Sequence, residues 1–278
     1  MKSLQLFRHW LMAITLTAFA GCVLAQAQKA APAQKGFEPQ VGQAGKDVIW
    51  VPTSQALVDA MMKIGKVTAK DTLYDLGSGD GRTVITAAKI GARAYGIEYN
   101  PDMVELSIQN AAKAGVSERA TFAKADLFET DFSKADVITM FLLSSINLKL
   151  RPKILDLKPG TRIVSNTFTM ENWKEDDSVN VTEGCTTYCT AYFWMVPAKV
   201  GGNWSLGKGD LALKQEFQVV SGTLTTDGKA VPVSGRLRGE QFTFTAAGAQ
   251  YDGRVNGNNI EGTRKAGGSS GAFSAARK

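Results

Sequence analysis

The sequence predicts an α/β fold: a mostly parallel sheet of seven strands that closes with an antiparallel hairpin, followed by a small antiparallel β domain. Between residues 50 and 168, short apolar segments of strand character alternate with segments of helical periodicity. This alternation is typical of a parallel sheet covered on both faces. From residue 200 onward helical periodicity is absent and turn dipeptides recur at Asp227-Gly228 and Asn256-Gly257, which favours antiparallel strands.

The start of the chain is typical of a secretory signal. Lys2 and Arg8 make it positive, and residues 10–20 form an apolar stretch that is short for a membrane span. We therefore expect a signal peptide over residues 1–25 and an exported, periplasmic protein. Lipidation at Cys22 and an uncleaved anchor are the alternatives.

A flexible leader is expected over residues 26–47, because Gln, Ala, Gly, Pro and Lys dominate there. The sheet domain is expected over residues 48–198. It opens with "WVPTSQALVDAMM", in which Thr53 or Ser54 caps a helix whose apolar residues share one face.

The elements of the sheet domain follow in order. Five strands are expected at apolar segments, namely residues 72–76, 92–99, 120–126, 135–143 and 161–168. Three helices are expected among them, at residues 82–91, 100–115 and 147–157. The closing antiparallel pair is expected at residues 178–184 and 186–197.

Cys185 directly precedes the last of these segments, and Cys189 lies within it. Residues four apart in a strand are separated by about 13 Å, which is too far for a disulfide. We therefore expect an open pair, unless the chain bends there. An exported protein would allow the bond.

The C-terminal domain is expected over residues 199–278, where glycine recurs in similar contexts at positions 222, 235, 253 and 262. Glycine at matching places lets a sheet curl, so we expect a small curled sheet or partial barrel. Five aromatic residues are expected to fill its core or, alternatively, to line a ligand mouth: Trp204, Phe217, Phe242, Phe244 and Phe273.

The charge of the C-terminal part indicates a kind of partner, and the histidine content excludes some kinds of catalytic and metal site. Residues 199–278 hold eleven Lys and Arg against six Asp and Glu. This favours contact with an anionic envelope surface, although a solvated basic face explains the same charge. The single histidine, His9, lies in the expected signal peptide. A histidine base and a histidine-containing zinc site are therefore excluded from the processed chain, and no metal is expected.

A glycine-rich turn follows the first predicted strand, with Gly77, Ser78, Gly79 and Gly81 in "GSGDGR". A dinucleotide fingerprint requires a third glycine at position 82, which is Arg82, and no Gly-Lys-Ser/Thr of a P-loop follows. A tight strand–helix connection is the alternative interpretation.

Three carboxylates, Asp75, Glu98 and Asp126, follow the ends of successive predicted strands. Because these ends line the ligand crevice of a parallel sheet, the three should converge. Such a site disfavours the pyrophosphate of NAD or ATP and suits S-adenosylmethionine: Glu98 accepts from the ribose hydroxyls, Asp126 from the adenine amine, and Asp75 faces the cationic end. Helix capping is the alternative role for each acid.

The motifs "YDLGSGDGR", "GIEYNP" and "KADLF" resemble those of class I S-adenosylmethionine-dependent methyltransferases. With "WVPTSQALVDAMM", the chain is similar to the group related to the ATP synthase c-subunit lysine methyltransferase. The resemblance implies a Rossmann-like seven-stranded methyltransferase sheet and S-adenosylmethionine as cofactor. It implies cofactor binding by Asp75, Gly77, Ser78, Gly79, Gly81, Glu98, Asp126 and Leu127.

We expect methyl transfer to an amine, either a protein lysine or a small molecule, because a desolvated amine needs no dedicated base. Nucleic acid is not expected, since "MFLL" replaces the Asn/Asp-Pro-Pro-Tyr motif after the fourth strand. No catalytic base is assigned, and the candidate residues are Thr53, Phe141 and Asn166. Phe141 is expected to line the acceptor slot and Thr53 to contact the amino-acid end of the cofactor, although a core role and a helix cap explain these two residues equally well. The oligomeric state is left open.

Two other functions remain open at this point. An exported protein has no obvious supply of a cytoplasmic cofactor, so the chain is alternatively a binding module that has lost its chemistry. The basic C-terminal domain is alternatively the functional part, through contact with the cell envelope.

Overall fold

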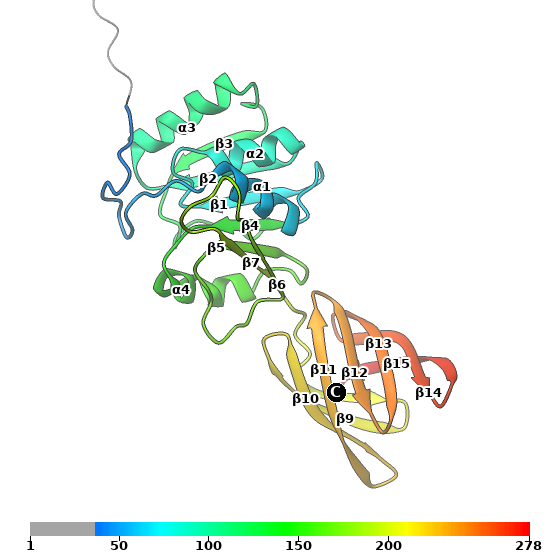
Figure 1. Ribbon diagram of the computed structural model, residues 1–278. Coiled ribbons are helices and arrows are strands. Elements are labelled where there is room, and N and C mark those ends of the chain that lie inside the picture. The colour runs from blue at the N-terminus through cyan, green and yellow to red at the C-terminus, as the bar shows by residue number, and fades with distance from the viewer. Residues whose placement is uncertain (1–36) are drawn as a thin grey trace, which may run out of the picture. The chain divides into compact units, whose positions relative to one another are not determined.

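The computed structural model describes residues 37–278 (Figure 1). The signal peptide predicted over residues 1–25, the lipidation alternative at Cys22 and residues 26–36 of the leader lie outside the described residues. In the described part of the chain, no helix is both long and apolar enough to cross a membrane.

The first part of the described chain is a seven-stranded sheet with the order β3-β2-β1-β4-β5-β7-β6. Its strands are β1 (Thr72–Leu76), β2 (Arg93–Glu98), β3 (Ala120–Lys124), β4 (Val137–Met140), β5 (Arg162–Asn166), β6 (Asp177–Asn180) and β7 (Thr190–Met195). The strands β1 to β5 are parallel, and β7 is antiparallel to both β5 and β6. The predicted parallel sheet with a closing antiparallel hairpin is therefore confirmed.

Four helices cover the sheet: α1 (Gln55–Ile64), α2 (Arg82–Ile90), α3 (Pro101–Lys113) and α4 (Ser144–Leu155). One apolar cluster contains buried residues of α1, α2 and α3. A second cluster contains Ile146, Leu150 and Ile154 of α4. These two clusters cover the central strands, where most residues of β4 and β5 are buried, whereas no residue of β6 at the edge of the sheet is fully buried.

The structure decides between the two predicted caps of α1 and shifts the start of α4. Ser54, not Thr53, caps α1, since its hydroxyl accepts a hydrogen bond from the amide of Leu57 at 3.3 Å. This leaves Thr53 available for another role. Helix α4 begins three residues before the predicted position, because β4 already ends at Met140.

The second part of the described chain is a closed antiparallel barrel with the order β10-β11-β12-β13-β14-β15-β8-β9. Its strands are β8 (Gly202–Leu206), β9 (Gly209–Glu216), β10 (Val219–Thr226), β11 (Lys229–Arg238), β12 (Gln241–Ala246), β13 (Ala249–Asn256), β14 (Asn259–Ala266) and β15 (Ser269–Arg277). Pairing of β15 with β8 closes it. The antiparallel β domain is confirmed, and it curls further than the predicted partial barrel.

The repeated glycines explain the tight curl. A Cβ on Gly222 would lie 2.0 Å from the carbonyl oxygen of Ala212, and one on Gly262 would lie 2.0 Å from that of Asp252. Both contacts are with the backbone of a neighbouring strand. Glycine is therefore required here because adjacent strands approach more closely than a side chain allows.

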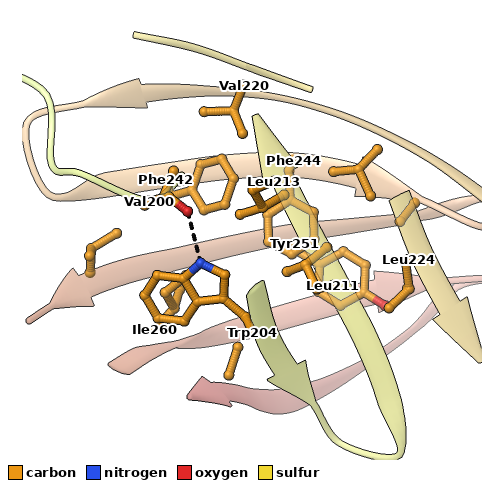
Figure 2. Close-up of a cluster of buried hydrophobic side chains, with 14 of the residues drawn as sticks. Val200, Trp204, Leu211, Leu213, Val220, Leu224, Phe242, Phe244, Tyr251 and Ile260 are labelled. Atoms are coloured by element: carbon orange, nitrogen blue, oxygen red, sulfur yellow. Dashed lines mark hydrogen bonds between the residues drawn. The ribbon is translucent and has the colours of Figure 1, made fainter. Parts of the chain in front are cut away.

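The barrel interior is filled by side chains. Trp204, Phe242 and Phe244 are buried in it as predicted, and the indole nitrogen of Trp204 donates to the carbonyl of Val200 at 2.8 Å (Figure 2). These three residues are core, not a ligand mouth. Phe273 is partly buried and packs against the same cluster.

The prediction that Phe217 belongs to the barrel core is wrong. Phe217 lies in the turn between β9 and β10 with φ +53°, and its ring stacks on Trp173 with centroids 5.8 Å apart. It therefore packs against the apolar cluster that contains α4. A residue in a turn leaves the alternation of the strands, so its side chain does not point into the barrel.

The expectation of an open Cys185–Cys189 pair is also wrong. The two cysteines form a disulfide with their Cα atoms 5.8 Å apart. Strand β7 begins only at Thr190, and the chain bends before it, with positive φ at Gly184 and Tyr188. The bend was the alternative expectation for this segment.

Candidate active site

The glycine loop joins β1 to α2 and has positive φ at Gly77, Gly79 and Gly81. The amides of Gly77 and Ser78 both donate to the carbonyl of Ile97, at 2.9 and 3.0 Å. This holds the loop against the end of β2. A Cβ on Gly79 would lie 2.7 Å from the indole nitrogen of Trp50, so this position also requires glycine on steric grounds.

Glu98 is the last residue of β2 and faces this loop. One carboxylate oxygen accepts from the amide of Gly79 at 3.0 Å, and the other accepts from the amide of Asn100 at 2.9 Å. Two backbone donors therefore fix the carboxylate at the end of the strand. Glu98 points toward the glycine turn, as predicted from its place at the strand end.

Asp75 lies deeper, near the end of β1. Its carboxylate is buried and accepts from the hydroxyl of Thr139 on β4 at 2.6 Å. Burial raises the pKa of Asp75 to about 7, although the hydrogen bond from Thr139 acts in the opposite direction. The group is therefore poised to gain charge when a cation lies beside it.

Asp126 follows β3 by two residues. Its carboxylate accepts from the amide of Phe128 at 2.9 Å and forms an ion pair with Lys46. The hydrogen bond from Lys46 is the main reason that the pKa of Asp126 lies below its ordinary value. A neighbouring carboxamide or amine would thus compete with Lys46 for this carboxylate.

Lys46 belongs to a hairpin that the sequence did not predict. The amide of Gly42 donates to the carbonyl of Trp50 at 2.8 Å, and the amide of Trp50 donates to that of Gln43 at 2.9 Å. The ammonium of Lys46 lies 4.9 Å from the centre of the Tyr99 ring. The described end of the predicted flexible leader is therefore ordered secondary structure against the glycine loop, not irregular chain.

These residues surround a cavity of about 510 Å³, a volume typical of small-molecule sites. Most of the predicted cofactor residues line it, namely Asp75, Gly77, Ser78, Gly79, Glu98, Asp126 and Leu127. Gly81 does not line it, because this glycine faces Phe122, whose ring a Cβ would meet at 2.8 Å. The other candidate residues Thr53 and Phe141 line the cavity, whereas Asn166 does not.

Asn166 reaches the cavity through Thr53. It is fully buried at the end of β5, and its side-chain nitrogen donates to the hydroxyl of Thr53 at 3.1 Å. The carbonyl of Thr53 in turn accepts from Arg82 at 2.8 Å. Asn166 therefore positions Thr53 and does not itself face a ligand.

The charged side chains that line the cavity are mostly acidic. Among the described residues they are Lys46, Asp47, Asp75, Asp80, Arg82, Glu98 and Asp126. Both cations are engaged, Lys46 with Asp126 and Arg82 with Asp80. The cavity therefore suits a ligand that carries positive charge and hydrogen-bond donors, and disfavours phosphate.

Comparison with known proteins agrees with this geometry. A family model described as the ANTKMT methyltransferase domain matches residues 75–177. A protein-lysine N-methyltransferase from Saccharolobus islandicus is 41% identical over 152 residues, which cover 54% of this chain and 94% of that protein. This chain belongs to the class I S-adenosylmethionine-dependent methyltransferases. Within them it is related to the ATP synthase c-subunit lysine methyltransferases.

Two further relatives of this methyltransferase are informative. The ATP synthase c-subunit lysine N-methyltransferase of Mus musculus is 33% identical, over 50% of this chain and 55% of its own length, so this chain spans about half of that relative. A crystal structure described as an RNA methyltransferase from Salinibacter ruber, in complex with S-adenosyl-L-homocysteine, is 45% identical with a TM-score of 0.51. It covers 54% of this chain and 96% of the solved one.

Several residues of the methyltransferase site were not predicted from the sequence. Lys46, Trp50, Phe168 and Tyr188 all line the cavity. They lie in a leader, in a loop and in a disulfide-closed bend, none of which has a periodicity that points to a site. The "CTTYC" segment is the one part of the sequence that pointed to such a bend, because two cysteines so close together can be bonded where the compartment is oxidising.

Proposed function

We propose that this protein transfers a methyl group from S-adenosylmethionine to lysine side chains of a protein acceptor. The observation that carries the proposal is the position of Glu98, held by the Gly79 amide at the wall of a mostly acidic cavity. The names of the curated relatives support the acceptor class.

The residues present fit this cofactor. Each carboxylate oxygen of Glu98 accepts one backbone hydrogen bond and has capacity for a ribose hydroxyl. The hydroxyl of Ser78 is buried at the cavity and has no hydrogen-bond partner within residues 37–278. An unpaired buried hydroxyl is costly, so a polar ligand atom beside it would be stabilising.

The proposed division of roles follows from position. Glu98 would hold the ribose, Asp126 and Leu127 the adenine, and Asp75 the cationic amino-acid end. When bound, S-adenosylmethionine supplies a methyl group that is already activated on a sulfonium. The chain itself then has to position an amine, exclude water from it and keep it neutral.

A lysine acceptor is favoured over RNA on electrostatic grounds. An RNA acceptor brings phosphates, which are repelled by the surplus of carboxylates around the cavity. A lysine brings one positive charge and a flexible apolar stem. The description of the Salinibacter ruber relative as an RNA methyltransferase makes RNA the competitor to test.

The test is methyl transfer from tritium-labelled S-adenosylmethionine to a panel of lysine-rich proteins and to total RNA. We expect label in protein and not in RNA. Acceptor proteins with acetylated lysines serve as the control and should stay unlabelled. Label in RNA alone, or no binding of the cofactor by calorimetry, would refute the proposed function.

We also propose that the protein is exported, with the methyltransferase domain over residues 48–198 and the β domain over residues 199–278. The Cys185–Cys189 disulfide supports export, because disulfides persist mainly in oxidising compartments. Cell fractionation with an antibody against the barrel checks this. Recovery in the cytoplasm with both thiols free would contradict it.

A further inference from the structure

Three aromatic rings meet at the cavity wall, each from a segment that follows or precedes a strand of the sheet. Phe141 follows β4, Phe168 follows β5, and Tyr188 lies in the disulfide-closed bend before β7. The ring centroids of Phe141 lie 5.2 Å from Tyr188 and 6.0 Å from Phe168, and those of Phe168 and Tyr188 lie 6.2 Å apart. We call these three residues the aromatic wall.

Core packing does not account for the aromatic wall. All three residues line the cavity. Phe141 and Phe168 are half-buried, and Tyr188 is 44% exposed, whereas aromatic core residues such as Trp173 and Trp194 are fully buried. Exposed ring surface that gathers at a cavity is typical of a binding site.

Tyr188 lies in a mostly exposed segment that the disulfide closes. The surrounding segment, residues 182–188, is exposed except for the half-buried Cys185. Tyr188 itself has φ +57°, an unfavourable conformation for a residue with a Cβ. The bond between Cys185 and Cys189 spans this residue. Its closure therefore limits where the ring of Tyr188 can go.

Resting on the proposed function, we propose that the aromatic wall binds the alkylammonium end of the acceptor lysine, and that the Cys185–Cys189 disulfide holds Tyr188 in that wall. Ring faces exclude most water from the bound ammonium, which lowers its pKa, so that it would lose its proton to solvent before transfer. The nitrogen lone pair would then form the N–CH3 bond as the S–CH3 bond of the cofactor breaks, with S-adenosylhomocysteine as the leaving group. The ring quadrupoles would stabilise the positive charge that develops on the methylated nitrogen. The same wall thus serves both stages of the transfer.

The affinity for the acceptor should therefore depend on the disulfide, whereas the affinity for the cofactor should not. Glu98 and the glycine loop hold the cofactor part of the cavity through backbone hydrogen bonds. None of these bonds involves residues 182–189. Reduction should therefore weaken the acceptor site selectively.

The first test is calorimetric binding of a trimethyllysine peptide to protein saturated with S-adenosylhomocysteine, which needs no turnover. Tyr188→Ala should weaken peptide binding about tenfold, whereas Tyr188→Phe should stay close to wild type. Phe37→Ala, an exposed aromatic outside the cavity lining, is the matched control and should change nothing. Affinity for S-adenosylhomocysteine should stay within about twofold in all three variants.

The second test addresses the disulfide. The double variant Cys185→Ser/Cys189→Ser should bind the peptide as weakly as Tyr188→Ala does. Dithiothreitol should weaken peptide binding by the wild type but not by the double variant.

Unchanged peptide affinity in Tyr188→Ala, or in both the double variant and the reduced wild type, would overturn the inference. So would a Tyr188→Ala variant that loses RNA methylation while lysine methylation persists, since the rings would then stack a base. A wild type that binds the peptide with these dependences but labels no lysine would refute the proposed function, and would reduce this inference to a disulfide-dependent alkylammonium site.

Discussion

The carboxylate of Glu98 accepts a hydrogen bond from the backbone amide of Gly79 at 3.0 Å, across the gap between two parallel strands. This contact joins the end of β2 to the loop that follows β1. It places the carboxylate beside the glycine turn, where no side chain of Gly77 or Gly79 shields it. A ligand that lies on the glycine turn must therefore offer hydrogen-bond donors to Glu98.

Glu98→Gln should weaken S-adenosylhomocysteine binding at least about tenfold, since hydrogen bonds to a charged acceptor contribute about 1.5–3 kcal/mol. Glutamine keeps the shape, but its amide nitrogen cannot accept. Isothermal calorimetry measures the change. Glu118→Gln, at an exposed position, is the control. Equal affinity of both variants and wild type would remove Glu98 from the site.

Asp75→Asn should stabilise the cofactor-free protein in a pH-dependent way. Burial raises the pKa of Asp75 from 3.8 to about 7, so between these values the folded state holds a proton that the unfolded state has lost. The contribution of Asp75 to the free energy of unfolding therefore falls as pH rises from about 4 to 7, and is constant above.

The Tm of Asp75→Asn should accordingly exceed that of wild type by several degrees near pH 8, and the difference should shrink toward about pH 4. Thermal melts across this pH range provide the measurement. Asp59→Asn, at an exposed carboxylate, should show no such trend. A constant difference between Asp75→Asn and wild type at every pH would show that Asp75 titrates normally.

Thr53→Val should cost about 1–3 kcal/mol of stability, because it leaves the buried side-chain nitrogen of Asn166 without its acceptor. Thr53→Ser keeps the hydroxyl and should lose much less. Urea denaturation of both variants separates the two. A valine variant as stable as the serine variant would mean that Asn166 finds another partner.

Gly262→Ala should destabilise the barrel by about 1–3 kcal/mol or more, since its Cβ would meet the backbone of Asp252 and force β13 and β14 apart. Gly271→Ala on β15 has nothing within 4 Å of the added carbon and should be nearly neutral. Circular dichroism melts of the two variants test this contrast. Similar melting of both would show that the strands adjust freely.

The sheet and the cofactor residues were predictable because they depend on local patterns. Apolar strands alternate with capped helices, and Asp75, Glu98 and Asp126 follow a rule about where parallel strands end. Such patterns can be recognised within short segments of the sequence. The contact of Glu98 with Gly79, nineteen residues away, needs only the assumption that neighbouring strands pair.

Other features depend on contacts that a sequence pattern does not encode. Lys46 belongs to a polar segment whose order comes from pairing around Trp50 and from Asp126, eighty residues away. Tyr188 reaches the cavity through a bend closed by a covalent bond. Phe217 looks like a core residue by type, but the turn that carries it points it elsewhere. In each case tertiary contacts override composition.

Closure of the barrel determines how the protein behaves after proteolysis. Every strand in it has two neighbours, because β15 pairs with both β14 and β8. A strand with one unpaired side exposes backbone donors and acceptors that can recruit other chains, which is a common origin of aggregation. Proteolytic loss of β15 would therefore create two such edges at once, on β8 and on β14, so clipped protein should be removed from solution instead of persisting as a slightly shorter form.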